Sequence, residues 1–133
     1  MKCVVVTPEK TVVDQDVDFV ALPLYDGEIG IAAQHTPLVG RLGAGELRFT
    51  ANNKTESFYV EGGFVEVFDN VVTLMTTHAW PVSMLKVDVA EKQLADALAR
   101  PGNTPELAQI REKKVMARRA RLRLAKKAAG MGG

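Results

Sequence analysis

Residues 58–75 read FYVEGGFVEVFDNVVTLM, which is three short runs of β-branched and aromatic residues separated by two turn signals. The turn signals are Gly62-Gly63 and Asp69-Asn70, residue types that tolerate the backbone conformations of tight turns. The pattern therefore predicts three consecutive strands, at 57–60, 64–68 and 71–75.

The middle strand alternates between two faces. Phe64, Glu66 and Phe68 share one face, and Val65 and Val67 share the other. Because only one of these faces carries a charge, we expect the strand to be largely buried.

The same pattern extends toward the N-terminus, where short runs rich in β-branched residues again lie between turn residues. These runs are residues 4–6, 11–13, 17–22, 29–31 and 46–49. Many short strands at close spacing predict a sandwich or a barrel and not a parallel sheet with crossover helices.

The hydrophobic period changes after Pro81. From Ser83, which we expect to be an N-cap, to Arg100, apolar residues recur at helical spacing. A second helix is predicted from Thr104, with Pro105 in its first turn, to about residue 127. The expected organisation is a β domain over residues 1–82 and a helical hairpin over 83–133, with disorder from residue 130 onward.

The second helix has a thin apolar stripe that consists partly of alanine. Its members are Leu107, Ile110, Ala117, Ala120 (or Arg121) and Leu124. Such a stripe buries little area, so we expect this helix to dock weakly and to adopt more than one position.

Composition excludes several classes of protein. The chain has 133 residues, of which 47% are hydrophobic, so it can form a core, and no apolar run reaches the length of a membrane span. We therefore expect a soluble chain, and its N-terminus is too short in apolar length for a signal peptide. The single cysteine, Cys3, excludes an internal disulfide and is expected to be a buried, inert thiol. One cysteine and two distant histidines form neither a zinc site nor a hydrolase triad, so we predict no metal site, no cofactor and no catalytic residues.

The overall charge of +1 conceals two halves of opposite sign. Residues 1–86 have a net charge of −5 and residues 87–133 a net charge of +6. Between Arg111 and Lys127, nine cations face the single carboxylate of Glu112. Self-repulsion on a weakly apolar helix is unfavourable unless an acidic surface neutralises it, so this helix is predicted to have an acidic partner. The alternative is a solvated helix whose cations offset the helix dipole.

Two motifs resemble a known family. GEIGI at 27–31 followed by HTPLV at 35–39 resembles the first signature of the epsilon subunit of bacterial F-type ATP synthase, and 58–67 with 70–74 resembles the second. The resemblance implies a ten-stranded β-sandwich followed by an antiparallel two-helix hairpin. It implies a non-catalytic subunit of the central rotor stalk, bound to the gamma subunit, the c-subunit ring and the beta and alpha subunits, which couples proton flow to ATP synthesis.

The resemblance also implies further properties. The complex would lie on the cytoplasmic face of the plasma membrane, with membrane contact only through the other subunits, and the C-terminal helices would restrain ATP hydrolysis. Glu28 and His35 would lie in loops that face the c ring and gamma. The cations of the second helix, among them Arg118, Arg119, Arg121 and Arg123, would meet acidic groups of the beta subunit or of gamma.

Some members of this family bind ATP between the two helices, through Ile/Leu-Asp-x-x-Arg-Ala at the start of the first. The matching residues here are VDVAEK at 87–92. Asp88 is retained, but Glu91 replaces the arginine and places a carboxylate where a triphosphate needs a cation. We therefore predict no tight nucleotide binding.

The rival interpretation is a small nucleic-acid-binding protein that uses the basic C-terminal helix. The acidic β domain and the scattered aromatic residues Tyr25, Tyr59 and Trp80 argue against it, because base stacking needs clustered aromatic rings. Membrane binding by the basic helix is also disfavoured, because that helix lacks a large apolar face.

Overall fold

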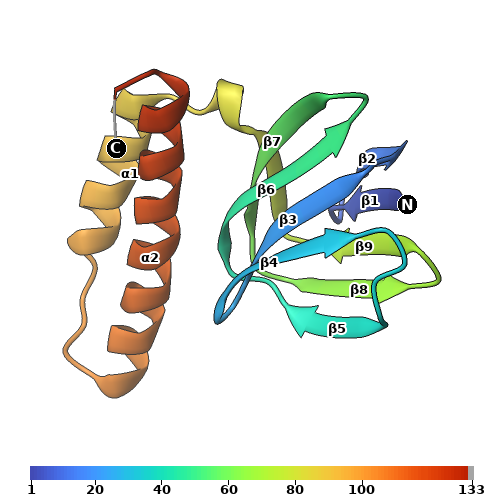
Figure 1. The fold of residues 1–133 in the computed structure, drawn as a ribbon. Helices are drawn as coiled ribbons and strands as arrows, with labels where there is room; N and C mark the ends of the chain where they lie inside the picture. The colour runs from blue at the N-terminus through green and yellow to red at the C-terminus, as the bar shows by residue number, and fades with distance from the viewer. Residues whose placement is uncertain (132–133) are drawn as a thin grey trace. The chain divides into compact units, whose positions relative to one another are not determined.

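A computed structural model describes residues 1–131 of the chain. Its contacts divide the chain into two compact units, Met1–Pro81 and the segment from Val82 onward. The first unit is a β-sandwich and the second is a pair of antiparallel helices (Figure 1).

The sandwich consists of two five-stranded sheets, which confirms the implied fold. The first sheet has the order β2 (Thr11–Asp16), β1 (Lys2–Val6), β9 (Val71–Met75), β8 (Phe64–Phe68) and β5 (Leu38–Arg41). The second sheet has the order β10 (His78–Pro81), β7 (Lys54–Glu61), β6 (Ala44–Ala51), β3 (Phe19–Leu24) and β4 (Gly27–Ala32). All pairings are antiparallel except that of β1 with β9.

The inward faces of the two sheets form the core. Side chains with at most 1% exposure come from both sheets, among them Val5, Val65 and Leu74 from the first and Leu22 and Phe49 from the second. Alternation along each strand places one residue in two in this core, which is the arrangement that a two-layer sandwich requires.

Two-residue turns fix the register of the β6–β7 and β8–β9 hairpins. Asn52-Asn53 joins β6 to β7 and Asp69-Asn70 joins β8 to β9, and all four residues have φ between 50° and 65°. Two consecutive positive φ angles define the turn whose twist matches that of the flanking strands, and Asn and Asp tolerate this conformation. The second of these turns, Asp69-Asn70, is one that the sequence predicted.

The helical unit begins with a 3₁₀ turn, η1 (Val82–Met84), followed by α1 (Val87–Leu98) and α2 (Pro105–Ala128). The prediction that Ser83 is the N-cap of the first helix is wrong, because Ser83 lies within η1 and Lys86 holds the N-cap position in an extended conformation. Thr104 caps α2 as predicted, with its side-chain oxygen accepting a hydrogen bond from the Leu107 amide.

The end of α2 is more ordered than the sequence indicated. The Gly130 amide donates to the Lys127 carbonyl and the Met131 amide to the Lys126 carbonyl, with Gly130 at φ 70°. This pair of hydrogen bonds is the Schellman motif, which satisfies carbonyls at a helix end. The predicted disorder is therefore wrong for Gly130 and Met131, and Gly132 and Gly133 lie outside the described residues.

Candidate interaction surfaces

The outward face of the first sheet carries exposed apolar side chains. Phe64 and Phe68 on β8, Met75 on β9 and Val39 on β5 are between 51% and 75% exposed, and we call these four residues the outer apolar face. Phe64 pairs with Met75 across the sheet, and Val39 pairs with Glu66 between the two phenylalanines. Contiguous exposed apolar residues on a sheet mark a surface that another protein covers.

This face corrects the prediction that β8 is largely buried. Val65 and Val67 are buried in the core, whereas Phe64, Glu66 and Phe68 alternate with them on the exposed side. Glu66 was the available signal, because a charge in the middle of an otherwise apolar strand face is compatible with solvent and not with a core.

Glu28 lies in strand β4, and not in a loop as predicted. Its carboxylate oxygens accept two hydrogen bonds from the Arg48 guanidinium on β6, at 3.0 and 3.2 Å. Arg48 also donates to Glu46 at 3.0 Å. The hydrogen bonds to Glu28 and then to Glu46 raise the pKa of Arg48, whose guanidinium links the two carboxylates.

His35 lies in the loop between β4 and β5, as predicted. Its Nδ1 lies 2.7 Å from the Thr36 carbonyl oxygen. The amide of the preceding Gln34 donates to the Asn70 side chain at 2.9 Å, which ties this loop to the β8–β9 turn.

The structure does not bring Glu28 and His35 together. Glu28 is near the start of β4, and His35 lies beyond its end at Ala32. Four residues of strand alone separate Glu28 from Ala32 by about 13 Å. The two residues therefore belong to opposite ends of the strand and cannot form one compact site.

The four arginines assigned to the basic helix differ in their surroundings. Arg119 and Arg123 are exposed and Arg118 is half-buried, but Arg121 is only 4% exposed and donates to the Gln93 side chain of α1 at 3.2 Å. Arg121 therefore belongs to the buried stripe of α2, where helical spacing gave it as the alternative to Ala120, and it does not present its charge to solvent. Its helical neighbours Ala117 and Ala125 are small, which leaves room for the guanidinium beside α1.

The apolar stripe of α2 is also only partly as predicted. Ala117, Ala120 and Leu124 are buried, whereas Leu107 and Ile110 are exposed near the turn that joins the helices. The stripe therefore covers the C-terminal two thirds of α2 and leaves its N-terminal end uncovered.

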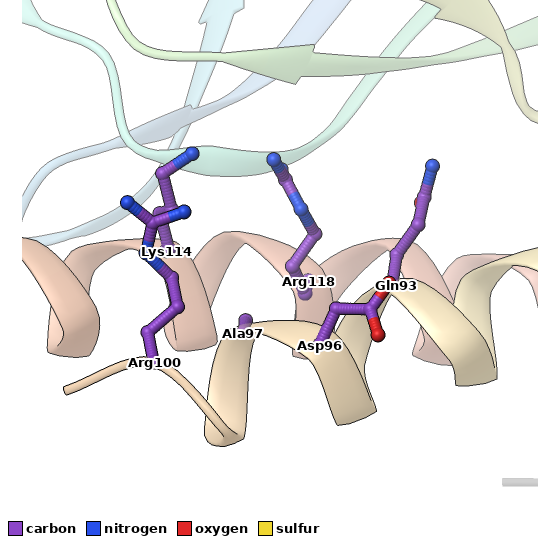
Figure 2. A pocket seen from close by; sticks show the side chains of 6 residues that line it. All are labelled: Gln93, Asp96, Ala97, Arg100, Lys114 and Arg118. Carbon is purple, nitrogen blue, oxygen red and sulfur yellow. The ribbon is translucent and has the colours of Figure 1, made fainter.

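A shallow groove of ≈ 200 Å³ lies between the two helices. Figure 2 shows Arg100 and Lys114 on one side of Ala97, with Gln93, Asp96 and Arg118 on the other. Asp88 and Glu91 do not line the groove. Asp88 instead lies in the first turn of α1, where the helix dipole favours a carboxylate.

Cys3 and the Gly62-Gly63 pair have structural roles. Cys3 is buried, as predicted. Its burial raises the pKa of the thiol to about 12, so the thiol is unreactive. Gly62 and Gly63 form a turn between β7 and β8, with φ of 68° and 101°, and no helix follows them as in a phosphate-binding loop.

Within residues 1–131, no group of three His, Cys, Asp or Glu side chains could hold a metal ion. Over the same residues, no helix combines the length and apolar character that crossing a membrane requires.

Comparison with known proteins identifies the class. Residues 1–82 match the family model of the β-sandwich domain of ATP synthase delta/epsilon chains. The ATP synthase epsilon chain of Rhodopirellula baltica is 48% identical over 123 residues, covering 92% of this chain and 96% of that one. The epsilon chain of Nitratidesulfovibrio vulgaris is 38% identical, covering 82% and 77%. The chain therefore belongs to the family of ATP synthase epsilon chains, which confirms the resemblance found in the sequence.

Solved structures share the fold at lower identity. A chain of the Euglena gracilis mitochondrial ATP synthase, in a structure of OSCP, F1 and c-ring, superposes with a TM-score of 0.79 at 22% identity, covering 96% of this chain and 79% of that one. A chain of the Tetrahymena thermophila mitochondrial ATP synthase central stalk and c-ring gives 0.69 at 16%, covering 94% and 96%. None of these relatives and structures is named as a nucleic-acid-binding protein, so they do not favour the rival interpretation.

Proposed function

We propose that this chain is a non-catalytic subunit of the rotor stalk of a proton-translocating F-type ATP synthase, where it couples ion flow to ATP synthesis. It binds the gamma subunit and the c-subunit ring through residues 1–82, and the helical hairpin restrains ATP hydrolysis. The complex places the chain at the cytoplasmic face of the plasma membrane. Family membership supports this role. The observation that supports the assigned docking surface is the exposure of the outer apolar face.

The outer apolar face is the docking surface for gamma in this proposal. Phe64, Phe68, Met75 and Val39 project from three strands of one sheet, so a partner meets them as one rigid surface. Large apolar side chains at the centre of an interface contribute most of the binding free energy. The charge of Glu66 at the centre of the face provides specificity, because a partner must supply a donor for it.

Glu28 and His35 serve different contacts in this proposal. Because they lie at opposite ends of β4, they belong to two separate contacts of the sandwich, one with the c ring and one with gamma beside the outer apolar face. Arg48 holds the Glu28 carboxylate in place, so that Glu28 is a positioned group and not a freely rotating charge.

The exposed cations of α2 are the regulatory group. Arg119 and Arg123 are the exposed members of the predicted set, and they are available to acidic segments of the beta subunit or of gamma. Exposed ion pairs contribute at most about 1 kcal/mol each, so several must act together to shift the position of the hairpin.

The test is co-purification of the tagged full-length chain from its own cell. It should retrieve the gamma, beta, alpha and c subunits.

Phe64→Asp with Phe68→Asp should lower the retention of gamma roughly 30-fold or more, since each replaces a central apolar contact with a buried charge. Val89→Asp with Ile110→Asp, which adds the same two charges at exposed positions of the helices, is the control and should leave retention unchanged. Retrieval of nucleic acid without these subunits would refute the proposed function. Normal retention of gamma by the Phe64/Phe68 variant would refute only the assigned docking surface.

A further inference from the structure

The loop between β4 and β5, residues 33–37, leads directly into the outer apolar face. It ends at Leu38, the first residue of β5, and Val39 of the outer apolar face follows. Leu38 pairs with Val67 on β8, so the loop enters the sheet beside the β8–β9 turn (Figure 1). Phe68 of the same face immediately precedes that turn. The loop and the turn therefore border the outer apolar face together.

The loop has a backbone conformation that its sequence disfavours. Gln34 has φ of 65°, in the left-handed region that few residues other than glycine, asparagine and aspartate adopt. A residue in this conformation needs contacts from its surroundings that compensate for the strain. The next residue is His35, whose Nδ1 lies 2.7 Å from the Thr36 carbonyl oxygen. A carbonyl only accepts, so Nδ1 carries the hydrogen and the ring is tied to the loop backbone.

Asn70 supplies the compensating contact from the neighbouring turn. Its Oδ1 atom accepts a hydrogen bond from the Gln34 amide at 2.9 Å, across 36 positions of sequence. Its backbone carbonyl accepts a second hydrogen bond from the Lys2 amide at 3.1 Å, so the residue that holds the loop is itself held by β1. Its φ is 63°, which asparagine tolerates. One residue therefore joins the loop, the β8–β9 turn and the first strand.

We propose that Asn70 is a positioning residue that makes the His35 loop and the outer apolar face one preformed docking surface. This inference rests on the proposed function, in which both contact gamma. Asn70 acts through the Gln34 amide and does not itself need to touch gamma. A partner that meets a preformed loop does not have to order it, and ordering is a cost that lowers affinity. The apparent affinity for gamma falls with the fraction of molecules in which the loop is correctly placed.

Three variants of the full-length chain separate the side chain of Asn70 from the turn in which it lies. Asn70→Gly keeps the positive φ and removes the acceptor, whereas Asn70→Asp keeps both. Asp69→Gly is the matched control, because it makes the same kind of change at the adjacent turn residue, where φ is 50°.

The first measurement is hydrogen exchange of backbone amides by NMR in the chain alone. Asn70→Gly should speed exchange at the Gln34 amide roughly tenfold, since that amide loses a hydrogen bond. The Lys2 amide should keep its protection, because its acceptor is the backbone carbonyl of residue 70. Asn70→Asp and Asp69→Gly should match the parent at both amides.

The second measurement is retention of gamma in the co-purification. Asn70→Gly should lower retention roughly threefold to tenfold, because the fraction of correctly placed loop cannot fall by more than the loop equilibrium shifts. Asn70→Asp should restore retention, and Asp69→Gly should leave it unchanged.

Unchanged protection of the Gln34 amide in Asn70→Gly would overturn the inference. Normal retention of gamma by the same variant, with that amide unprotected, would also overturn it, because loop position would then not matter for docking. An equal loss of retention in Asp69→Gly, or loss of protection at Lys2 in Asn70→Gly, would assign the effect to the turn and not to the side chain. Failure of the parent itself to retrieve gamma is a distinct result, which would refute the proposed function and with it the partner named here.

Discussion

Replacing Gly63 by alanine should destabilise the β-sandwich far more than the same change at the adjacent Gly62. Both residues have positive φ, 68° at Gly62 and 101° at Gly63, in the turn between β7 and β8. A Cβ atom at Gly62 would meet nothing within 4 Å. A Cβ atom at Gly63 would overlap the Met75 carbonyl oxygen and lie 2.9 Å from the Thr76 Cα.

The magnitudes follow from these surroundings. An alanine with positive φ costs about 1–2 kcal/mol, and this cost applies at both positions. At Gly63 the neighbours are backbone atoms that no side-chain rotation can move, so the end of β9 must shift, at a further cost of about 1–3 kcal/mol. The free energy of unfolding should therefore fall by about 2–5 kcal/mol for Gly63→Ala and by about 1–2 kcal/mol for Gly62→Ala. The larger loss is a substantial part of the total stability of a small domain.

Urea unfolding monitored by tryptophan fluorescence measures the difference. The single tryptophan, Trp80, lies in β10 and stacks on Tyr59 of β7, so its emission reports on the sandwich. With an m-value of about 1–3 kcal/mol/M, Gly63→Ala should lower the midpoint about twice as far as Gly62→Ala. Gly62→Asn should be milder still, because asparagine tolerates positive φ. Equal losses at the two glycines would refute the argument from close backbone approach.

Two further predictions concern ligand binding and pH. Calorimetry on the full-length chain should detect no ATP binding tighter than millimolar, and Glu91→Arg with Lys92→Ala should strengthen binding; micromolar affinity of the unaltered chain would contradict the prediction. The pKa of Cys3 is about 12 in the folded chain against an ordinary 9.0, so the native state holds its proton after the unfolded state has lost it. The free energy of unfolding should therefore fall between pH 9 and pH 12 in the parent, by more than in Cys3→Ala, and an equal fall in both would contradict the burial argument.

The sequence predicted most strands because hydrophobic alternation and turn chemistry are local signals. The runs at 64–68 and 71–75 match β8 and β9 residue for residue. The residues alone did not indicate β5 and β10, which the resemblance to a ten-stranded family supplied. Both have four residues and lie at sheet edges, and they contain Gly40 and Pro81. Inside a sheet a proline indicates the end of a strand, because it lacks the amide that pairs with a neighbouring strand. At an edge the missing amide faces no neighbouring strand, so proline is tolerated there and does not indicate an end.

The interaction surfaces were harder to predict. Whether one face of a strand or helix is exposed depends on what packs against that face and not on its residues alone. Phe64 and Phe68 are as apolar as core residues, and the charge of Glu66 between them is the one signal in the strand that this face points outward. Arg121 is the opposite case, a charged residue that helical spacing gave as an alternative to Ala120 in the stripe, whereas its charge grouped it with the exposed cations. Its hydrogen bond to Gln93 on α1, 28 positions earlier in the chain, is a contact that no pattern within α2 could reveal. The cations of α2 therefore form two groups with different surroundings, and their replacement should have different effects: Arg119 and Arg123 are exposed, whereas Arg121 is buried beside α1. Replacing all four arginines together would combine these effects, so each group should be varied alone.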